Sequence, residues 1–342
     1  MKADIDLVIG RKSFSSGLLP ELIAVLRRSR PGDLIAVIGD EESIGSELET
    51  WCRFTKNPLL ESSVEDGRAR WVFRCGTVAL PAEDNRPVGS RLWLYTNFDC
   101  NLRCDYCCVR SSPKARRREL GLERVQRIAR EAAQLGVQEI FVTGGEPFLL
   151  EDIGEILSAC ATAAPTTVLT NGMLFTGRRA QSLRTLPRDR VVLQISLDSP
   201  TPGLHDLHRG AGTWARARAG IQHARAEGFR VRLAATVATD AEAEEFRQFL
   251  DAEKIAAADR VIRLIARRGL ASEGLAVTRA DLVPEVTITA EGVYWHPVGA
   301  EDVDLLVTRD IFPLSDSFAA VRRAFDRVGE HARQLARIFN CA

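Results

Sequence analysis

The chain has 342 residues, of which 45% are hydrophobic and 27% are charged. Its 46 basic and 46 acidic residues cancel, so net charge gives no electrostatic case for a nucleic-acid or membrane-surface partner. No apolar run reaches the roughly 20 residues that cross a bilayer, and the first ten residues lack the pattern of a secretory signal. We therefore expect a cytoplasmic protein with two domains.

The first 80 residues have the pattern of a small α/β domain. Apolar runs predict four strands, at 5–9, 34–38, 59–64 and 69–73. Helical periodicity predicts two helices, at 18–26 and 47–53. Residues 81–91, with two prolines and one glycine, are predicted to be a linker.

From residue 92 to about 270 the pattern becomes a repeat of strand, loop and helix. The predicted strands are 92–95, 139–143, 166–170, 191–196, 230–235 and 260–265. The predicted helices are 120–135, 151–163, 176–186, 212–227 and 241–253. Strands separated by helices need crossover connections, which predicts a parallel sheet. Six such units fall short of the eight of a complete barrel, and periodicity does not determine whether the sheet closes. The expected fold is a partial (β/α)6 parallel barrel. A hairpin at 286–295 and a helix at 317–339 are expected in the remaining extension, residues 271–342.

The cysteines are unevenly distributed, and half of the eight lie between Cys100 and Cys108. In a cytoplasmic chain they are read as metal ligands, reactive thiols or buried hydrophobic residues. Cys100, Cys104 and Cys107 directly follow a predicted strand, and three thiolates in one loop suit an iron–sulfur cluster. A zinc site would need a fourth ligand in a second paired element, which the sequence lacks. Cys108 is expected to point elsewhere, and a chance group of buried thiols is the alternative.

The motifs around these cysteines resemble those of the radical S-adenosylmethionine (SAM) superfamily, and most closely its SPASM/sulfatase-maturase-like branch. The resemblance covers residues 92 to about 270 and rests on motifs at successive strand ends: the stretch 95–107, Thr143–Pro147, Thr170–Gly172, Ser196–Asp198 and His205–Gly210. Ligand sites of parallel α/β sheets lie at such strand ends.

This resemblance implies two cofactors, a [4Fe-4S] cluster held by Cys100, Cys104 and Cys107, and SAM. The residues implied in SAM binding are Tyr106, Gly144, Gly145, Glu146, Asn171, Ser196 and Arg209. Among them Glu146 is expected to hold the SAM amino group, Ser196 the ribose hydroxyls and Arg209 a carboxylate. The implied reaction is reductive cleavage of SAM to a 5′-deoxyadenosyl radical, which abstracts hydrogen from a substrate. The electron would come from an external donor such as flavodoxin or ferredoxin.

Residues 1–76 have a second resemblance, to the TusA-type small sulfur-carrier family with its two-layer βαβαββ fold. It rests on Pro31–Asp33, Trp51–Arg53 and Glu65–Gly67. The family carries a Cys-Pro pair at the start of its first helix, where this chain has Ser15 and Ser16. A hydroxyl cannot carry persulfide sulfur, so we expect a domain that binds rather than one that transfers sulfur. Cys75 is read as a buried structural residue.

The C-terminal hairpin resembles a remnant of the auxiliary-cluster region of related enzymes. It lacks their cysteines, and His296 and Cys341 are too few ligands for a second cluster. The basic run 114–118 is expected to be a solvated helix start.

The sequence therefore predicts a radical SAM enzyme without defining its substrate. The first choice is a bacterial secondary-metabolite intermediate, and the alternatives are sulfur insertion, peptide modification, or a non-catalytic iron–sulfur or zinc-binding module.

Overall fold

The computed structural model describes residues 1–327 apart from residues 11, 14–17, 41–43, 56, 66 and 77–86. The chain divides into two compact units. The first contains the described residues up to 76 together with Ala276–Val283, and the second contains residues 87–275 and 284–327. The sequence analysis assigns Ala276–Val283 to the C-terminal extension instead, and its domain boundaries stay a prediction.

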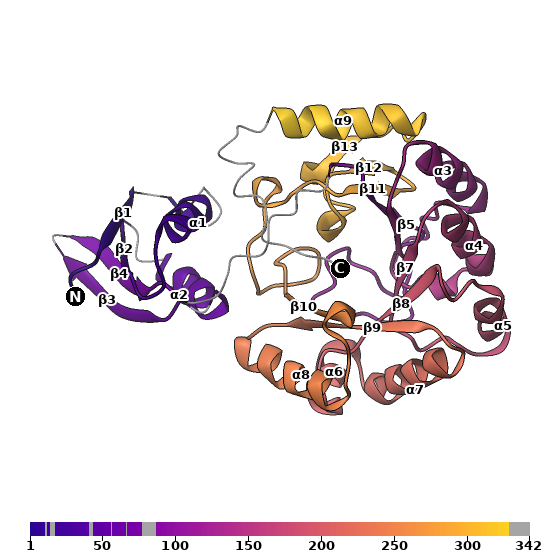
Figure 1. Cartoon of the computed structure of the whole chain (residues 1–342), viewed down its shortest axis with the longest axis horizontal. Coiled ribbons are helices and arrows are strands. Elements are labelled where there is room, and N and C mark those ends of the chain that lie inside the picture. The colour runs from indigo at the N-terminus through magenta and orange to yellow at the C-terminus, as the bar shows by residue number, and fades with distance from the viewer. Residues whose placement is uncertain are drawn as a thin grey trace. The chain divides into compact units, whose positions relative to one another are not determined.

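The first unit has the predicted element order. It contains β1 (Ile5–Gly10), α1 (Leu18–Arg28), β2 (Leu34–Gly39), α2 (Ile44–Phe54), β3 (Leu59–Glu65) and β4 (Arg68–Arg74). The sheet order is β1-β2-β4-β3, with β1 parallel to β2 and the other pairs antiparallel. The helices cover one face of this sheet (Figure 1), and the core between the two layers includes Trp51 packed edge-on against Phe73.

The sulfur-carrier resemblance of this unit stays a prediction. Ser15 and Ser16, on which the loss of the carrier thiol rests, lie outside the described residues. Cys52 and Cys75 are both buried in the core of the unit. Burial, and then the charge of Glu49, raises the pKa of Cys52 to about 12, so that thiol is a poor nucleophile near neutral pH.

The second unit is an open parallel sheet covered by helices, as predicted. Its six predicted strands are β5 (Arg91–Tyr95), β6 (Glu139–Thr143), β7 (Thr166–Thr170), β8 (Val191–Ser196), β9 (Arg230–Val237) and β10 (Arg260–Leu264). Its predicted helices are α3 (Leu122–Gln134), α4 (Ile153–Ala163), α5 (Gly177–Thr185), α7 (Thr213–Ala226) and α8 (Asp240–Ala252). These helices lie along the outer face of the curved sheet (Figure 1), so the strand side chains that point toward them form the apolar core.

Tertiary pairing adds three strands that the sequence does not place in this sheet. The hairpin of β11 (Val286–Thr289) and β12 (Gly292–Tyr294) forms as predicted. It does not stay separate, because β11 pairs in parallel with β5, and β13 (Leu306–Thr308) pairs with β12. The sheet order is therefore β10-β9-β8-β7-β6-β5-β11-β12-β13.

Three local predictions need adjustment. A further helix, α6 (Pro202–Arg209), precedes α7, and its eight residues are too few for a clear period. The last helix, α9 (Leu314–Asp326), starts three residues before its predicted start, and its predicted end at 339 lies outside the described residues. The basic run 114–118 is a loop and not a helix start, because α3 begins only at Leu122.

Candidate functional site

The three candidate ligands lie in one closed loop at the carboxyl end of β5. Asp99 and Ser112 form an isolated parallel bridge, and the Cys100 amide donates to the Ser112 carbonyl over 3.2 Å. This pairing closes the loop 99–112, which we call the cysteine loop. Cys100 is buried, whereas Cys104 and Cys107 are partly exposed.

The thiols are shielded from water, and backbone amides point at two of them. Burial, and then the charge of Glu146, raises the pKa of Cys100, and burial raises the pKa of Cys104 to about 11 against the opposing charge of Arg209. Two backbone amides point at sulfur over 3.3 Å, from Leu102 to Cys100 and from Ser111 to Cys107. A metal deprotonates such thiols outright, and amide donors to sulfur are a feature of iron–sulfur sites.

The relation of the cysteine loop to a cluster rests on its donor set and not on the positions of the sulfur atoms. Among the described residues, no three His, Cys, Asp or Glu side chains are placed so that they could hold one metal ion. In a [4Fe-4S] cluster each cysteine binds a different iron, so the thiolates are spread around an inorganic core instead of converging on one point. The donor set of three thiols in one loop therefore fits the expected group.

Gly145 lies directly against the cysteine loop, and Gly144 lies against Asn97, just before that loop. A side-chain carbon added at Gly144 would lie 2.3 Å from the Asn97 Oδ1, and one added at Gly145 would lie 2.2 Å from the Asp99 carbonyl oxygen. The Gly145 amide donates to the Asn97 carbonyl over 3.1 Å, and the Glu146 amide to that of Asp99 over 3.0 Å. The two glycines thus let the backbone at the end of β6 lie close to Asn97 and Asp99.

Glu146 is fully buried, and its carboxylate links two strand ends. Its oxygens accept hydrogen bonds from the Phe148 amide (3.0 Å), the Thr170 hydroxyl (2.7 Å) and the Asn171 amide (2.8 Å). Burial raises the pKa of Glu146 in spite of these donors. A carboxylate has about four acceptor positions. Donors within the protein occupy three of them in Glu146, which leaves about one.

Asn171 and Ser196 lie at the ends of β7 and β8. The Asn171 Nδ2 donates over 2.7 Å to the Oδ1 of Asn101, a residue of the cysteine loop, and its Oδ1 accepts from the Met173 amide over 3.0 Å. Ser196 is partly exposed. Asn171 and Glu146 therefore lie beside the cysteine loop, whereas the place of Ser196 in the site stays a prediction.

Tyr106 and Arg209 meet at Asp198, which the sequence analysis does not select as a site residue. Arg209 donates to both Asp198 oxygens, from Nε over 2.6 Å and from Nη2 over 3.1 Å. The Tyr106 hydroxyl also donates to Asp198. Burial favours the neutral acid, but Arg209 outweighs it and holds the pKa of Asp198 below its usual value. The sequence analysis expects Arg209 to bind a carboxylate, and the structure pairs it with a carboxylate of the chain itself, that of Asp198.

Helix α6 fixes the cysteine loop from the other side. The His208 Nδ1 lies 2.8 Å from the Asp105 carboxylate, and the Asp105 amide donates to the His208 carbonyl over 3.2 Å. His205 accepts from the Asp198 amide at Nδ1 over 3.1 Å. Burial, and then the positive charge of Arg209, lowers the pKa of His205 to about 4, so its ring is neutral near pH 7.

A second set of contacts joins the cysteine loop to the segment after β12. Arg110 pairs with Glu301 and Asp302, and Arg118 pairs with Glu301 while its guanidinium lies 3.8 Å from the centre of the Phe98 ring. The sequence analysis expects the basic run 114–118 to be solvated, but Arg118 is held by these contacts. No sequence pattern indicates these pairs, since the partners are about 180 residues apart.

His296 and Cys108 are packed within the same unit. The His296 Nδ1 accepts from the Val298 amide over 3.2 Å, and burial lowers the pKa of His296 to about 3. Cys108 packs beside Tyr95, Phe98 and Ala300. Cys341 lies outside the described residues. That Cys108 is not a ligand stays a prediction.

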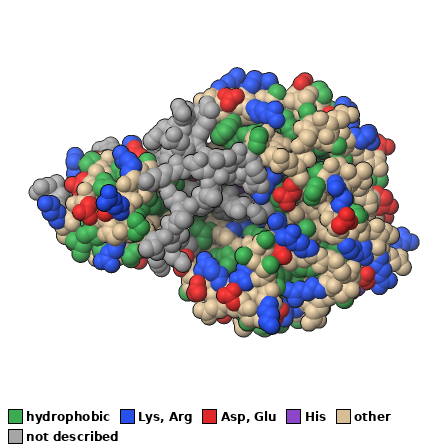
Figure 2. Space-filling model, in the orientation of Figure 1, with side chains coloured by type: hydrophobic (Ala, Val, Ile, Leu, Met, Phe, Trp, Pro, Cys, Tyr) green, Lys and Arg blue, Asp and Glu red, His purple; other side chains and the backbone are tan. Residues whose placement is uncertain are grey.

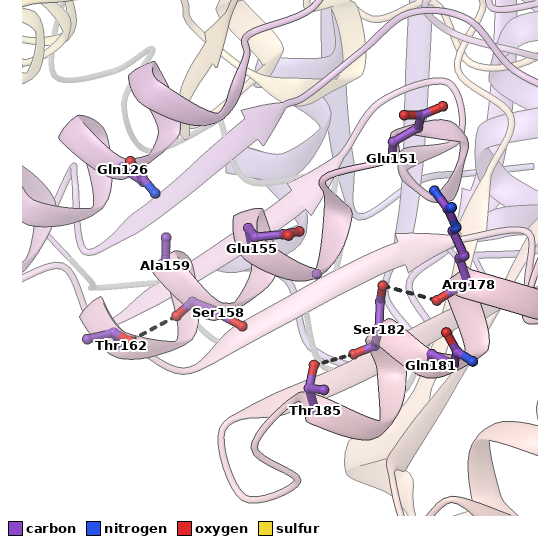
Figure 3. Close-up of a pocket in the computed structure, with 11 residues that line it drawn as sticks. Gln126, Glu151, Glu155, Ser158, Ala159, Thr162, Arg178, Gln181, Ser182 and Thr185 are labelled. Atoms are coloured by element: carbon purple, nitrogen blue, oxygen red, sulfur yellow. Dashed lines mark hydrogen bonds between the residues drawn. The ribbon is translucent and has the colours of Figure 1, made fainter.

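A hollow of about 740 Å³ lies elsewhere, on the outer surface over α4 and α5 (Figure 3). Its lining is mostly polar and includes Glu155, Ser158, Arg178 and Gln181. None of the residues at the strand ends lines it. We therefore place the candidate site at the cysteine loop.

Comparisons with known proteins identify the domain. Residues 94–252 match the sequence profile of the radical SAM superfamily. Over 166 residues the chain is 34% identical to the antilisterial bacteriocin subtilosin biosynthesis protein AlbA of Bacillus subtilis (strain 168), covering 47% of this chain and 36% of that protein. Over 120 residues it is 38% identical to a GTP 3′,8-cyclase of Synechococcus sp. (strain CC9902), covering 33% of each. The chain contains a radical SAM domain.

A solved structure supports the fold. Native anSMEcpe with bound AdoMet, which is SAM, is similar with a TM-score of 0.54 and 11% identity, covering 73% of this chain and 83% of that one. At this identity the likeness concerns the fold alone. The chain spans about a third of the length of the two curated relatives, and within its described residues no helix is both long and apolar enough to cross a membrane.

Proposed function

We propose that this protein is a radical SAM enzyme whose cluster ligands are Cys100, Cys104 and Cys107. The observation that carries the proposal is the closed cysteine loop, held against the ends of β6 and β7 through Gly145, Glu146 and Asn171. When bound, the reduced cluster supplies the electron that cleaves SAM, and the radical formed from SAM abstracts hydrogen from the substrate.

The remaining residues would position SAM. Ser196 and Asn171 present polar groups at strand ends beside the loop, and Tyr106 places an aromatic ring between two cluster ligands. Gly144 and Gly145 keep the loop close to the sheet. Glu146 holds the strand ends together and offers the SAM amino group a remaining acceptor position. Arg209, which is paired with Asp198, would orient Tyr106.

Anaerobic SAM cleavage tests this proposal. The protein, reconstituted with iron and sulfide and reduced with dithionite, should convert SAM to 5′-deoxyadenosine and methionine. The Cys100→Ala, Cys104→Ala and Cys107→Ala triple variant should form neither. A wild-type protein that binds zinc in preference to iron, or that leaves SAM intact, would contradict the proposal and favour a non-catalytic metal-binding module.

The substrate is either a small molecule or a peptide. A bacterial secondary-metabolite intermediate is our first choice. Peptide modification is the second candidate, because a relative is a bacteriocin biosynthesis protein and anSMEcpe has been solved with a bound peptide. Sulfur insertion has the weakest support, since the predicted carrier thiol is replaced by serine. We further propose a flavodoxin or ferredoxin as electron donor and the cytoplasm as location.

A further inference from the structure

The most unusual polar side chain outside the candidate site is Gln194, in the middle of β8. It is 1% exposed, and neither its Oε1 nor its Nε2 has a hydrogen-bond partner among the described residues. Buried amide groups are almost always paired, because losing their bonds to water is costly. The amide therefore needs a partner other than the described residues, and a buried water or part of a ligand would supply one.

Gln194 points away from the helices. A side-chain carbon added at Gly220 of α7 would lie 1.8 Å from the Gly172 carbonyl oxygen, and one added at Gly172 would lie 2.7 Å from the Ile195 side chain. Ile195 thus faces α7, and its neighbour Gln194 faces the opposite, concave side of the sheet. Ser196 shares that side and lies about 7 Å further along the strand, at the carboxyl end.

Arg232 is the register partner of Gln194 on β9. Its Nε and Nη1 are buried without a hydrogen-bond partner, and its closest carboxylate, on Glu139, is 4.0 Å away. Gln194 and Arg232 are thus adjacent on one face of the sheet. Gln194 offers an acceptor that makes no hydrogen bond, and both residues offer donors that make none.

The charges around Arg232 are balanced, which favours a neutral ligand group. Glu139 also lies 3.5 Å from Arg91, and Arg91 lies 3.4 Å from Glu285. The formal charges of these two arginines and two carboxylates sum to zero. A ligand carboxylate would add an unbalanced charge, whereas an amide adds none.

We propose that Gln194 and Arg232 bind an amide group of the substrate, either a peptide bond or a carboxamide. Its carbonyl oxygen accepts from the Gln194 Nε2 and from Arg232, and its N–H donates to the Gln194 Oε1. The inference rests on the proposed function, because the face that carries Gln194 leads to Ser196 at the candidate site. It narrows the substrate to an amide-bearing molecule.

The first experiment tests whether Gln194 is unpaired in the absence of ligand. Thermal unfolding of the full chain is compared with that of Gln194→Met and Gln194→Leu, which remove the polar group with little change in volume. We expect at least one variant to unfold about 2–4 °C higher. If both unfold at a lower temperature than wild type, a fixed water or internal contact satisfies the amide, and the proposal fails. Gln181→Leu, in the outer hollow over α5, is the matched control and should change little.

The second experiment measures binding with a defined probe, N-acetylglycinamide, by calorimetric titration of the reconstituted protein in the presence of SAM. Gln194→Met and Arg232→Met should weaken binding at least tenfold, and Gln181→Leu should not. N,N-dimethylacetamide keeps the carbonyl oxygen but lacks the N–H donor, so it should bind wild type more weakly than N-acetylglycinamide and lose less affinity in Gln194→Met. No binding to wild type, or equal binding of N-acetylglycinamide to wild type and Gln194→Met, would overturn the inference.

Failure of this inference is distinguishable from failure of the proposed function. SAM cleavage by the wild type with dithionite needs no substrate and reports on the proposed function alone. If SAM is cleaved while N-acetylglycinamide binding is independent of Gln194, only the amide site is wrong. If SAM is not cleaved while binding depends on Gln194, the radical SAM proposal is wrong and the amide site stands.

Discussion

At the scale of single residues, the cysteine loop contains three predicted cluster ligands and a fourth cysteine, Cys108, that is predicted not to be a ligand. Replacing Cys100, Cys104 and Cys107 with Ala should abolish iron binding and the brown colour, because each thiolate would bind one iron of the cluster. Cys108→Ala is the matched control and should keep the cluster, since Cys108 lies outside the spacing of the three predicted ligands. Iron analysis after anaerobic reconstitution measures both, and a full complement of iron in the triple variant would exclude the assignment.

Two buried histidines predict a pH dependence of stability. The folded-state pKa values of His205 and His296, about 4 and about 3, lie below the usual value of 6.5. The unfolded chain therefore binds more protons between pH 6.5 and 4, and lowering the pH through this window destabilises the fold. Each histidine contributes about 1.4 kcal/mol per pH unit.

Chemical denaturation of the cluster-free chain at several pH values measures this dependence. In His205→Asn, where the amide oxygen can replace Nδ1 as acceptor, the slope of unfolding free energy against pH should fall by about 1.4 kcal/mol per unit. His296→Asn should behave in the same way. An unchanged slope in both variants would show that the two rings are not neutral in the folded state.

At the scale of elements, the contact between the end of β6 and the cysteine loop has no room for a side chain. Gly145→Ala would place a carbon 2.2 Å from the Asp99 carbonyl oxygen, so the loop must shift and two backbone hydrogen bonds must weaken. We expect a loss of about 2–4 kcal/mol in stability and reduced iron incorporation.

Gly203→Ala, in α6, is the control for this substitution. No atom outside its own turn lies within 4 Å of the added carbon, and alanine in place of glycine favours a helix by up to about 1 kcal/mol. Denaturation and iron analysis of both variants separate a steric effect from a general effect of losing glycine. Equal behaviour of the two variants would show that the loop does not depend on this contact.

At the scale of the whole molecule, the first unit is predicted to bind and not to transfer sulfur. Its cysteines, Cys52 and Cys75, are buried and have raised pKa values, so neither should accept sulfur. Incubation with a cysteine desulfurase and labelled cysteine should leave the first 76 residues unlabelled by mass spectrometry. Label on either thiol would restore a sulfur-transfer role.

The number of clusters is a second property of the whole chain. Because the C-terminal hairpin has no cysteines, reconstituted protein should bind about four irons per chain. Iron and sulfide analysis with the protein concentration determined independently measures this ratio. A value near eight would show that Cys52, Cys75, Cys160 or Cys341 take part in a second cluster, and would favour sulfur insertion.

Surface charge is also a property of this scale. On the face shown in Figure 2, basic and acidic side chains are interspersed, as equal numbers of the two kinds allow. The pair of Arg110 with Asp302 uses part of this charge to hold the cysteine loop, and the pair of Arg118 with Glu301 holds the segment that follows the loop.

The sequence by itself determined the periodic elements and the order of the motifs. All six parallel strands and all the α-helices between them except α6 follow from local hydrophobic periodicity, and the motif order places Cys100–Cys107, Gly144–Glu146 and Asn171 at strand ends. Both properties are local, since a strand or helix depends mainly on residues a few positions apart.

Only the tertiary structure decided the contacts between distant segments. Pairing of β11 with β5 extends the sheet, Asp198 links Tyr106 to Arg209, and Gln194 and Arg232 become register partners on one face. Such pairs have no signature in a single sequence, because their partners are separated by tens to hundreds of residues and meet only when the sheet forms. The same reason explains why a buried, unpaired amide can be recognised only after folding.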